Sequence, residues 1–178
     1  MTHLFKLWLV CLYQYLQMSL FRSTPAHLPY NPYSLLLTIF AYMGVGFVLL
    51  SEERNLLSIL TQILIEISIL YLICSAVLRL SGRSERILQT LSALIGVNLV
   101  IGFVSIPVYQ MLPPSTGEQI DPLTIKITLA ILLWNLAALS LIFRRAFEIN
   151  TLTAGFIALN YFLLYEFAYF SLLQAPNP

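Results

Sequence analysis

Long apolar stretches, separated by short polar connectors, dominate this sequence. A helix needs about 20 mostly apolar residues to cross the hydrocarbon core of a bilayer. Five stretches meet this requirement, at residues 33–50, 56–78, 87–110, 123–143 and 152–173. No connector is long enough to form a soluble domain. The pattern therefore predicts an all-α polytopic membrane bundle with five transmembrane helices.

The composition agrees with a membrane protein. Of the 178 residues, 59% are hydrophobic and only 10% are charged, whereas an ordinary soluble domain has about 25% charged residues. So few charges cannot cover the surface of a soluble protein. The net charge of +1 gives no general attraction to nucleic acid.

The N-terminal segment, residues 4–21, is also apolar, but its polar residues gather on one side of a helix. At 100° per residue, one narrow sector contains His3, Lys6, Tyr13, Gln14 and Gln17. This pattern favours an amphipathic helix at the membrane interface, with a sixth span as the alternative. Three prolines in residues 22–33 predict a connector. We therefore divide the chain into an N-terminal region, 1–32, and a transmembrane domain, 33–178.

The basic residues predict the orientation, because Lys and Arg accumulate in cytoplasmic loops. One side of the predicted bundle holds seven of them: Lys6, Arg22, Arg79, Arg83, Arg86, Arg144 and Arg145. The other side holds Arg54 and Lys126, together with four acids, Glu52, Glu53, Glu118 and Asp121. We expect a cytoplasmic N-terminus and an external C-terminus.

Polar residues lie near the middle of four of the predicted spans. Glu66, Asn98, Asn135 and Asn160 share one depth to within about 3 Å at 1.5 Å rise per residue, and Gln62 lies one turn from Glu66. An ionised carboxylate at this depth is costly. We therefore expect Glu66 to be protonated or hydrogen-bonded and to face the bundle interior, within a polar cluster formed by Gln62, Glu66, Asn98, Asn135 and Asn160.

This cluster has two interpretations. It can hold the helices in register through interhelical hydrogen bonds, which is the interpretation that we favour from the sequence. Alternatively, it can form a proton or substrate site, for which Glu166, about one turn outward of its span's midpoint, is a second acidic candidate. The spans contain no Lys, Arg or His that could act as a counter-ion at this depth, which weakens the case for a transporter.

Two further groups of residues have a functional and a structural interpretation. Tyrosines at four-residue spacing, Tyr161, Tyr165 and Tyr169, can line a lipid or quinone groove, although helix packing explains them as well. Five arginines can contact anionic lipid headgroups or an acidic partner, or only fix the topology: Arg79, Arg83, Arg86, Arg144 and Arg145.

Motifs for enzymatic chemistry are absent from the sequence. His3 and His27 have no acid or thiol at a useful spacing, and no zinc-protease, nucleophile-elbow or phosphate-loop motif occurs. Cys11 and Cys74 lie in apolar runs, without metal-ligand spacing. We expect no enzyme activity, no cofactor and no bound metal.

The stretches "QTLSALIGVNLVIGFVSIPVY" and "ILLWNLAALSLIFRRAFEINTLTAGFIAL" pair a small-residue-rich third span with a Trp in the fourth and a basic-aromatic loop. Through these features the last two-thirds of the chain resembles the Yip1-like group of small five-span membrane proteins. The resemblance covers about residues 30–173 and implies no functional residue. For a short chain of this kind it implies a membrane protein, which we place in a bacterial inner (cytoplasmic) membrane.

These observations favour a non-enzymatic accessory protein that packs with other membrane proteins or with itself and contacts membrane lipids. A small transporter or proton-coupled channel centred on Glu66 is the first alternative. A lipid- or quinone-binding subunit of a membrane complex is the second.

Overall fold

The protein is a helical bundle in the computed structural model, which describes residues 2–50, 55–111 and 121–173. The described residues contain no strand and form six α-helices: α1 (Thr2–Ser19), α2 (Pro32–Leu50), α3 (Leu56–Leu80), α4 (Ile87–Tyr109), α5 (Pro122–Phe147) and α6 (Thr151–Leu173). Of these, α2 to α6 are long and apolar enough to cross a membrane. The predicted all-α bundle is confirmed, and its five spans agree closely with the helices. The largest difference is at the end of α5, which extends to residue 147 instead of 143.

Local sequence signals explain where several helices begin. Asn55 caps α3, because its side-chain oxygen accepts a hydrogen bond from the Ser58 amide at 2.8 Å. Asn150 caps α6 in the same way, through the Thr153 amide at 2.8 Å. Proline occupies the first position of α5, where the missing amide proton costs no helical hydrogen bond.

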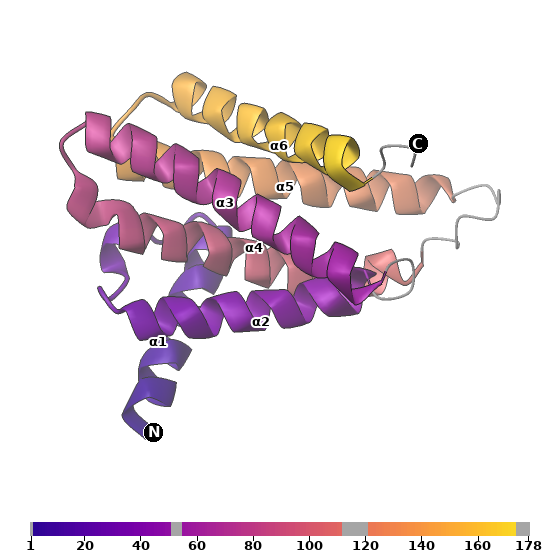
Figure 1. Cartoon of the computed structure of the whole chain (residues 1–178), viewed down its shortest axis with the longest axis horizontal. Helices are drawn as coiled ribbons and strands as arrows, with labels where there is room; N and C mark the ends of the chain where they lie inside the picture. The colour runs from indigo at the N-terminus through magenta and orange to yellow at the C-terminus, as the bar shows by residue number, and fades with distance from the viewer. Residues whose placement is uncertain (1, 51–54, 112–120, 174–178) are drawn as a thin grey trace.

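The five long helices run side by side (Figure 1), and their contacts form a closed ring with a further contact across it between α3 and α4. Contacts connect α2 to α3, α3 to α6, α6 to α5, α5 to α4, and α4 back to α2. The α3–α4 and α5–α6 connections both lie at one end of this ring, at the left in Figure 1. We call this the basic end, because it carries Arg79, Arg83, Arg86, Arg144 and Arg145.

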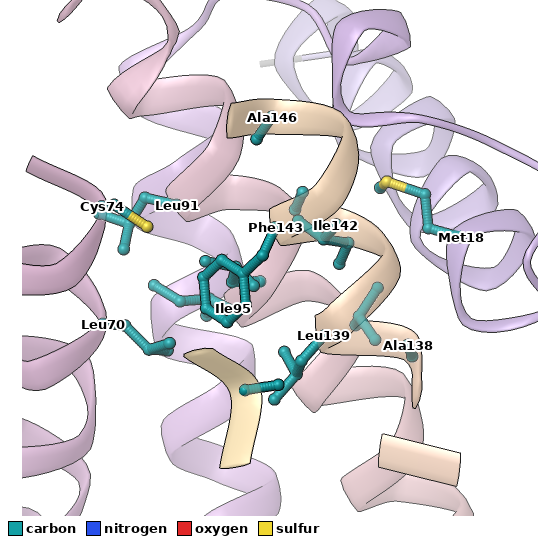
Figure 2. Close-up of a cluster of buried hydrophobic side chains, with 14 of the residues drawn as sticks. Met18, Leu70, Cys74, Leu91, Ile95, Ala138, Leu139, Ile142, Phe143 and Ala146 are labelled. Atoms are coloured by element: carbon teal, nitrogen blue, oxygen red, sulfur yellow. The ribbon is translucent and has the colours of Figure 1, made fainter. Parts of the chain in front are cut away.

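The half of the bundle nearest the basic end is densely packed. Every residue of α4 from 90 to 99 is buried, and Phe143 of α5 is fully enclosed. Figure 2 shows side chains from α3, α4 and α5 around Phe143, including Leu70, Ile95 and Leu139. This core is apolar and continuous, as expected where helices must exclude both lipid and water.

The N-terminal helix α1 crosses the bundle instead of running along it (Figure 1). It is not among the helices long and apolar enough to span a membrane. Tyr15 lies at the crossing, with 0% exposure, and its hydroxyl bonds with Ser92 of α4 at 2.7 Å and Thr38 of α2 at 3.2 Å. Its ring lies against Gly96, where even a Cβ would approach the ring to 2.3 Å. A residue without a side chain is therefore required for this crossing.

Hydrogen bonds from α4 and α5 also hold the end of α1 and the segment that follows it. The indole of Trp134 donates to the Ser19 carbonyl at 2.7 Å, and Gln89 donates to the Leu28 carbonyl at 2.8 Å. Arg145 donates to the Ser23 carbonyl. The N-terminal region is therefore docked on the transmembrane domain through both its helix and its connector.

An ion-pair cluster joins the two connections at the basic end. Glu148 follows α5 with a left-handed backbone, φ 56°, which ends the helix and directs the chain into α6. Its carboxylate pairs with Arg83 at 2.5 Å and Arg86 at 2.8 Å. Arg83 also donates to the Phe147 carbonyl at 3.3 Å. Hydrogen bonding from Arg86, together with the charges of Arg83 and Arg86, lowers the pKa of Glu148.

Replacement of Gly96 by alanine tests how closely α1 packs. The added Cβ must displace the Tyr15 ring, because the two would otherwise lie 2.3 Å apart. Overpacking of this kind costs about 1–3 kcal/mol. We expect Gly96→Ala to lower the melting temperature in detergent and to expose Cys11 of α1, which is 1% exposed, to a permeant maleimide.

Gly44→Ala is the matched control, since a Cβ there meets nothing within 4 Å. Cys74, which is 0% exposed in α3, should stay protected in both variants. Unchanged labelling of Cys11 in Gly96→Ala would contradict close docking of α1.

The Glu148 cluster predicts a pH-dependent contribution to stability. A lowered pKa means that the folded state favours the carboxylate, so the stabilisation is present above the ordinary value of 4.5 and disappears as the pH falls through the lowered value. We expect Glu148→Gln to lower the melting temperature at pH 7 by no more than about 3 °C, because exposed ion pairs contribute little. The difference from the natural protein should close under acidic conditions.

Glu85→Gln is the control for this measurement, because Glu85 is exposed at the same end and forms no ion pair with a described residue. If Glu148→Gln lowers the melting temperature by the same amount at pH 3 as at pH 7, the charge of Glu148 does not stabilise the fold.

Candidate functional site

Glu66 lies at the centre of a buried network of hydrogen bonds. It projects from the middle of α3 and is 8% exposed. Tyr42 of α2 donates to one carboxyl oxygen. Asn98 of α4 donates to the other at 3.1 Å, and Tyr161 of α6 donates to the same oxygen at 3.0 Å. One carboxyl group thus connects four helices.

Asn135 brings the fifth long helix into the network. Its amide nitrogen donates to the side-chain oxygen of Asn98 at 3.3 Å. Asn98 therefore accepts one bond and donates another, as an amide can. None of the buried side-chain nitrogen and oxygen atoms in the described part of the chain lacks a hydrogen-bond partner. The structure thus brings together the predicted residues Glu66, Asn98 and Asn135.

Gln62 forms a second polar pair one helical turn from Glu66. Its amide donates to the hydroxyl of Tyr165 on α6. Tyr161 and Tyr165 are one turn apart as well, so α3 and α6 face each other through two successive polar contacts. Of the predicted tyrosine stripe, these two side chains point into the bundle, and the side chain of Tyr169 lies outside the described part of the structure.

Asn160 does not belong to the network, contrary to the prediction. Its amide bonds to the Phe156 carbonyl of its own helix at 2.8 Å. The reason is rotational: consecutive residues on a helix point about 100° apart, so when Tyr161 faces Glu66, Asn160 is directed aside. The prediction considered the depth of each polar residue and not its angle around the helix.

Tyr42 and Tyr161 are the partners that the sequence analysis did not identify. Tyr42 lies near the middle of α2 (Pro32–Leu50), at the depth where the acid and the amides were expected. Extending the depth comparison from amides to tyrosine hydroxyls would have found it. For Tyr161 the spacing pattern suggested a groove or helix packing, and its hydroxyl in addition bonds to Glu66.

A cavity of about 570 Å³ extends from this network between α2, α3, α4, α5 and α6. Glu66, Asn98 and Tyr161 line its deep end, which borders the packed core of Figure 2. Leu50 and Tyr109, in the last turns of α2 and α4, line it at the end of the bundle opposite the basic end. The bundle is thus packed in one half and hollow in the other.

The cavity wall combines apolar and polar groups. Ile63, Ile101, Ile131, Leu132 and Leu136 provide aliphatic surface. Gln62, Ser105, Thr128, Tyr165 and Glu166 provide polar groups between the Glu66 network and the end of the bundle opposite the basic end. Glu166 therefore faces the same space as Glu66. In the described ranges, no three His, Cys, Asp or Glu side chains are grouped so that they could hold a metal ion.

The five arginines at the basic end have different environments. Arg83, Arg86 and Arg145 bond to Glu148 or to the Ser23 carbonyl. Arg79 and Arg144 are exposed and bond to no described residue. Three of the five arginines therefore take part in contacts that hold the fold together. Within the described part of the chain, Arg79 and Arg144 are the two whose side chains form no hydrogen bond or ion pair.

Comparisons with known proteins found no match to this chain among family models, curated proteins or solved structures. The resemblance to Yip1-like proteins stays a prediction.

Asn98 belongs to the Glu66 network and Asn160 does not, so their replacement should affect the stability of the protein differently. Asn98→Ala removes hydrogen bonds to Glu66 and Asn135, and interhelical bonds of this kind contribute about 0.6 to 1.7 kcal/mol each in a membrane. Asn160→Ala removes a bond within one helix turn and should change stability by less than about 0.5 kcal/mol. Unfolding of both variants by titration with sodium dodecyl sulfate measures the difference, and equal losses would place Asn160 in the network after all.

Proposed function

We propose that this protein binds a small amphipathic molecule in its intramembrane cavity and acts without enzymatic chemistry. The observation that carries the proposal is the cavity of about 570 Å³ with Glu66 at its deep end. Ligand pockets occupy about 300–1,000 Å³ and combine apolar walls with a few placed polar groups. The ligand's polar group would lie at Glu66, and its apolar part would contact the aliphatic wall.

The position of the packed core favours binding over a channel. A channel needs a continuous polar path across the bilayer. Between Glu66 and the basic end, the space is filled by side chains such as Leu70, Ile95 and Phe143, all with at most 1% exposure. This closed half supports a site that is reached from the opposite end of the bundle.

The orientation and location expected from the sequence are part of this proposal. We place the basic end in the cytoplasm and the cavity toward the outer face of a bacterial inner membrane, because seven of the nine basic residues belong to the side that includes the basic end. Arg79 and Arg144 would then contact anionic lipid headgroups. The accessory role in assembly with other membrane proteins or a second copy stays a prediction, and a bound ligand is compatible with it.

A pair of tryptophan variants on α5 tests occupancy of the cavity. Leu132 lines the cavity, so Leu132→Trp fills part of it. Leu133 is the next residue, is 58% exposed and does not line the cavity, so Leu133→Trp adds the same side chain to the outer surface. We expect small molecules that co-purify with the natural protein, measured by native mass spectrometry from nanodiscs, to be lost in Leu132→Trp and kept in Leu133→Trp.

Circular dichroism and melting curves of both variants control for misfolding. The same adducts in all three proteins would contradict the proposal that the cavity holds a ligand.

A further inference from the structure

The charge of the cavity restricts the ligands that it can take. Two acidic residues line it, Glu66 and Glu166, and none of the described lining residues is Lys, Arg or His. Lys126, near the start of α5 at the cavity end of the bundle, is exposed and is not among the residues that line the cavity. Inside the cavity, an anionic ligand would therefore meet two carboxyl groups and no positive charge from the described lining residues, and like charges in a low-dielectric site repel strongly.

When Glu66 is ionised, the groups around it can stabilise its carboxylate. Tyr42, Asn98 and Tyr161 all point a donor group at its two oxygens. A carboxylate only accepts hydrogen bonds, and several donors directed at it compensate for part of the hydration that it loses on burial. Such donors would not neutralise a charge on Glu66, and no cation of the described chain forms an ion pair with it. A positively charged ligand would provide the missing counter-charge.

Aromatic rings add a second feature that favours a cation. Tyr42, Tyr109, Tyr161, Phe162 and Tyr165 line the cavity. The faces of such rings attract ammonium groups, above all in sites that exclude water. A bare metal ion would need several oxygen, nitrogen or sulfur ligands close around it, and no three His, Cys, Asp or Glu side chains of the described residues are grouped in that way.

We infer that the ligand is an organic monocation, a protonated amine or a quaternary onium group that carries an apolar body. Its charge lies beside Glu66, its apolar part contacts the aliphatic wall, and Glu166 attracts it from the end of the bundle opposite the basic end. This inference rests on the proposed function and specifies its ligand class.

Two probes of matched shape and opposite charge test the inference directly. Tetraphenylphosphonium is a cation with four phenyl rings, and tetraphenylborate is an anion with the same four rings. We expect the full chain in detergent to bind tetraphenylphosphonium saturably in isothermal titration calorimetry. Its binding of tetraphenylborate should be no stronger than the tetraphenylborate binding of Leu132→Trp, in which the cavity is partly filled. Glu66→Gln keeps the side-chain shape and should weaken phosphonium binding about tenfold or more, because it removes the charge.

Glu166→Gln is a second variant, chosen because Glu166 is not among the residues that bond to Glu66. It should weaken phosphonium binding less than Glu66→Gln does, with an unchanged melting temperature, so the inference can be tested even if Glu66→Gln unfolds. Glu85→Gln, at the basic end, should bind like the natural protein.

The possible outcomes separate the two proposals. Equal binding of both ions, or phosphonium binding that is unaffected in both Glu66→Gln and Glu166→Gln, would overturn the cation inference. If phosphonium fails to bind while co-purified adducts are lost in Leu132→Trp, the cavity binds a ligand of another class. If neither the probes nor co-purified molecules distinguish Leu132→Trp from Leu133→Trp, the proposed function fails as well.

Discussion

The requirement that polar groups be hydrogen-bonded inside a bilayer governs this structure. No water is available in the hydrocarbon core, so a carboxyl group there must find partners on other helices or hold its proton. Glu66 finds three, on α2, α4 and α6, and Asn135 extends the network to α5. Because one side chain contacts donors from three directions, the rotation and depth of all the surrounding helices are fixed together.

The two halves of the bundle satisfy different physical demands. On the basic side of Glu66, α4 lies against α2, α3 and α5, and the crossing helix α1 covers it as well. Close packing here is possible because Gly96 admits the Tyr15 ring. On the other side α1 is absent, and the ring of five helices encloses a cavity. The Glu66 network lies at the boundary, where it closes one end of that cavity.

The sequence predicts the helices well because the length and apolarity of a span are imposed by the bilayer and not by neighbouring helices. The shared depth of Glu66, Asn98 and Asn135 follows from the same constraint. Asn160 shows where this reasoning fails, because depth does not determine which way a side chain points around its helix. The cavity could not be predicted at all. It depends on the order of helices around the ring, in which α3 packs mainly against α6, α4 and α2, and no local pattern encodes that order.

The choice of a carboxyl group at position 66 bears on whether the network only holds helices together. Amides perform that task elsewhere in this bundle, since Asn135 bonds to Asn98 and Gln62 bonds to Tyr165. A glutamine at position 66 could accept and donate in the same place without the cost of a buried charge. Glutamate differs from it in the ability to carry a negative charge, and a carboxylate at this position would face the cavity. The inferred attraction of a cation would account for this difference.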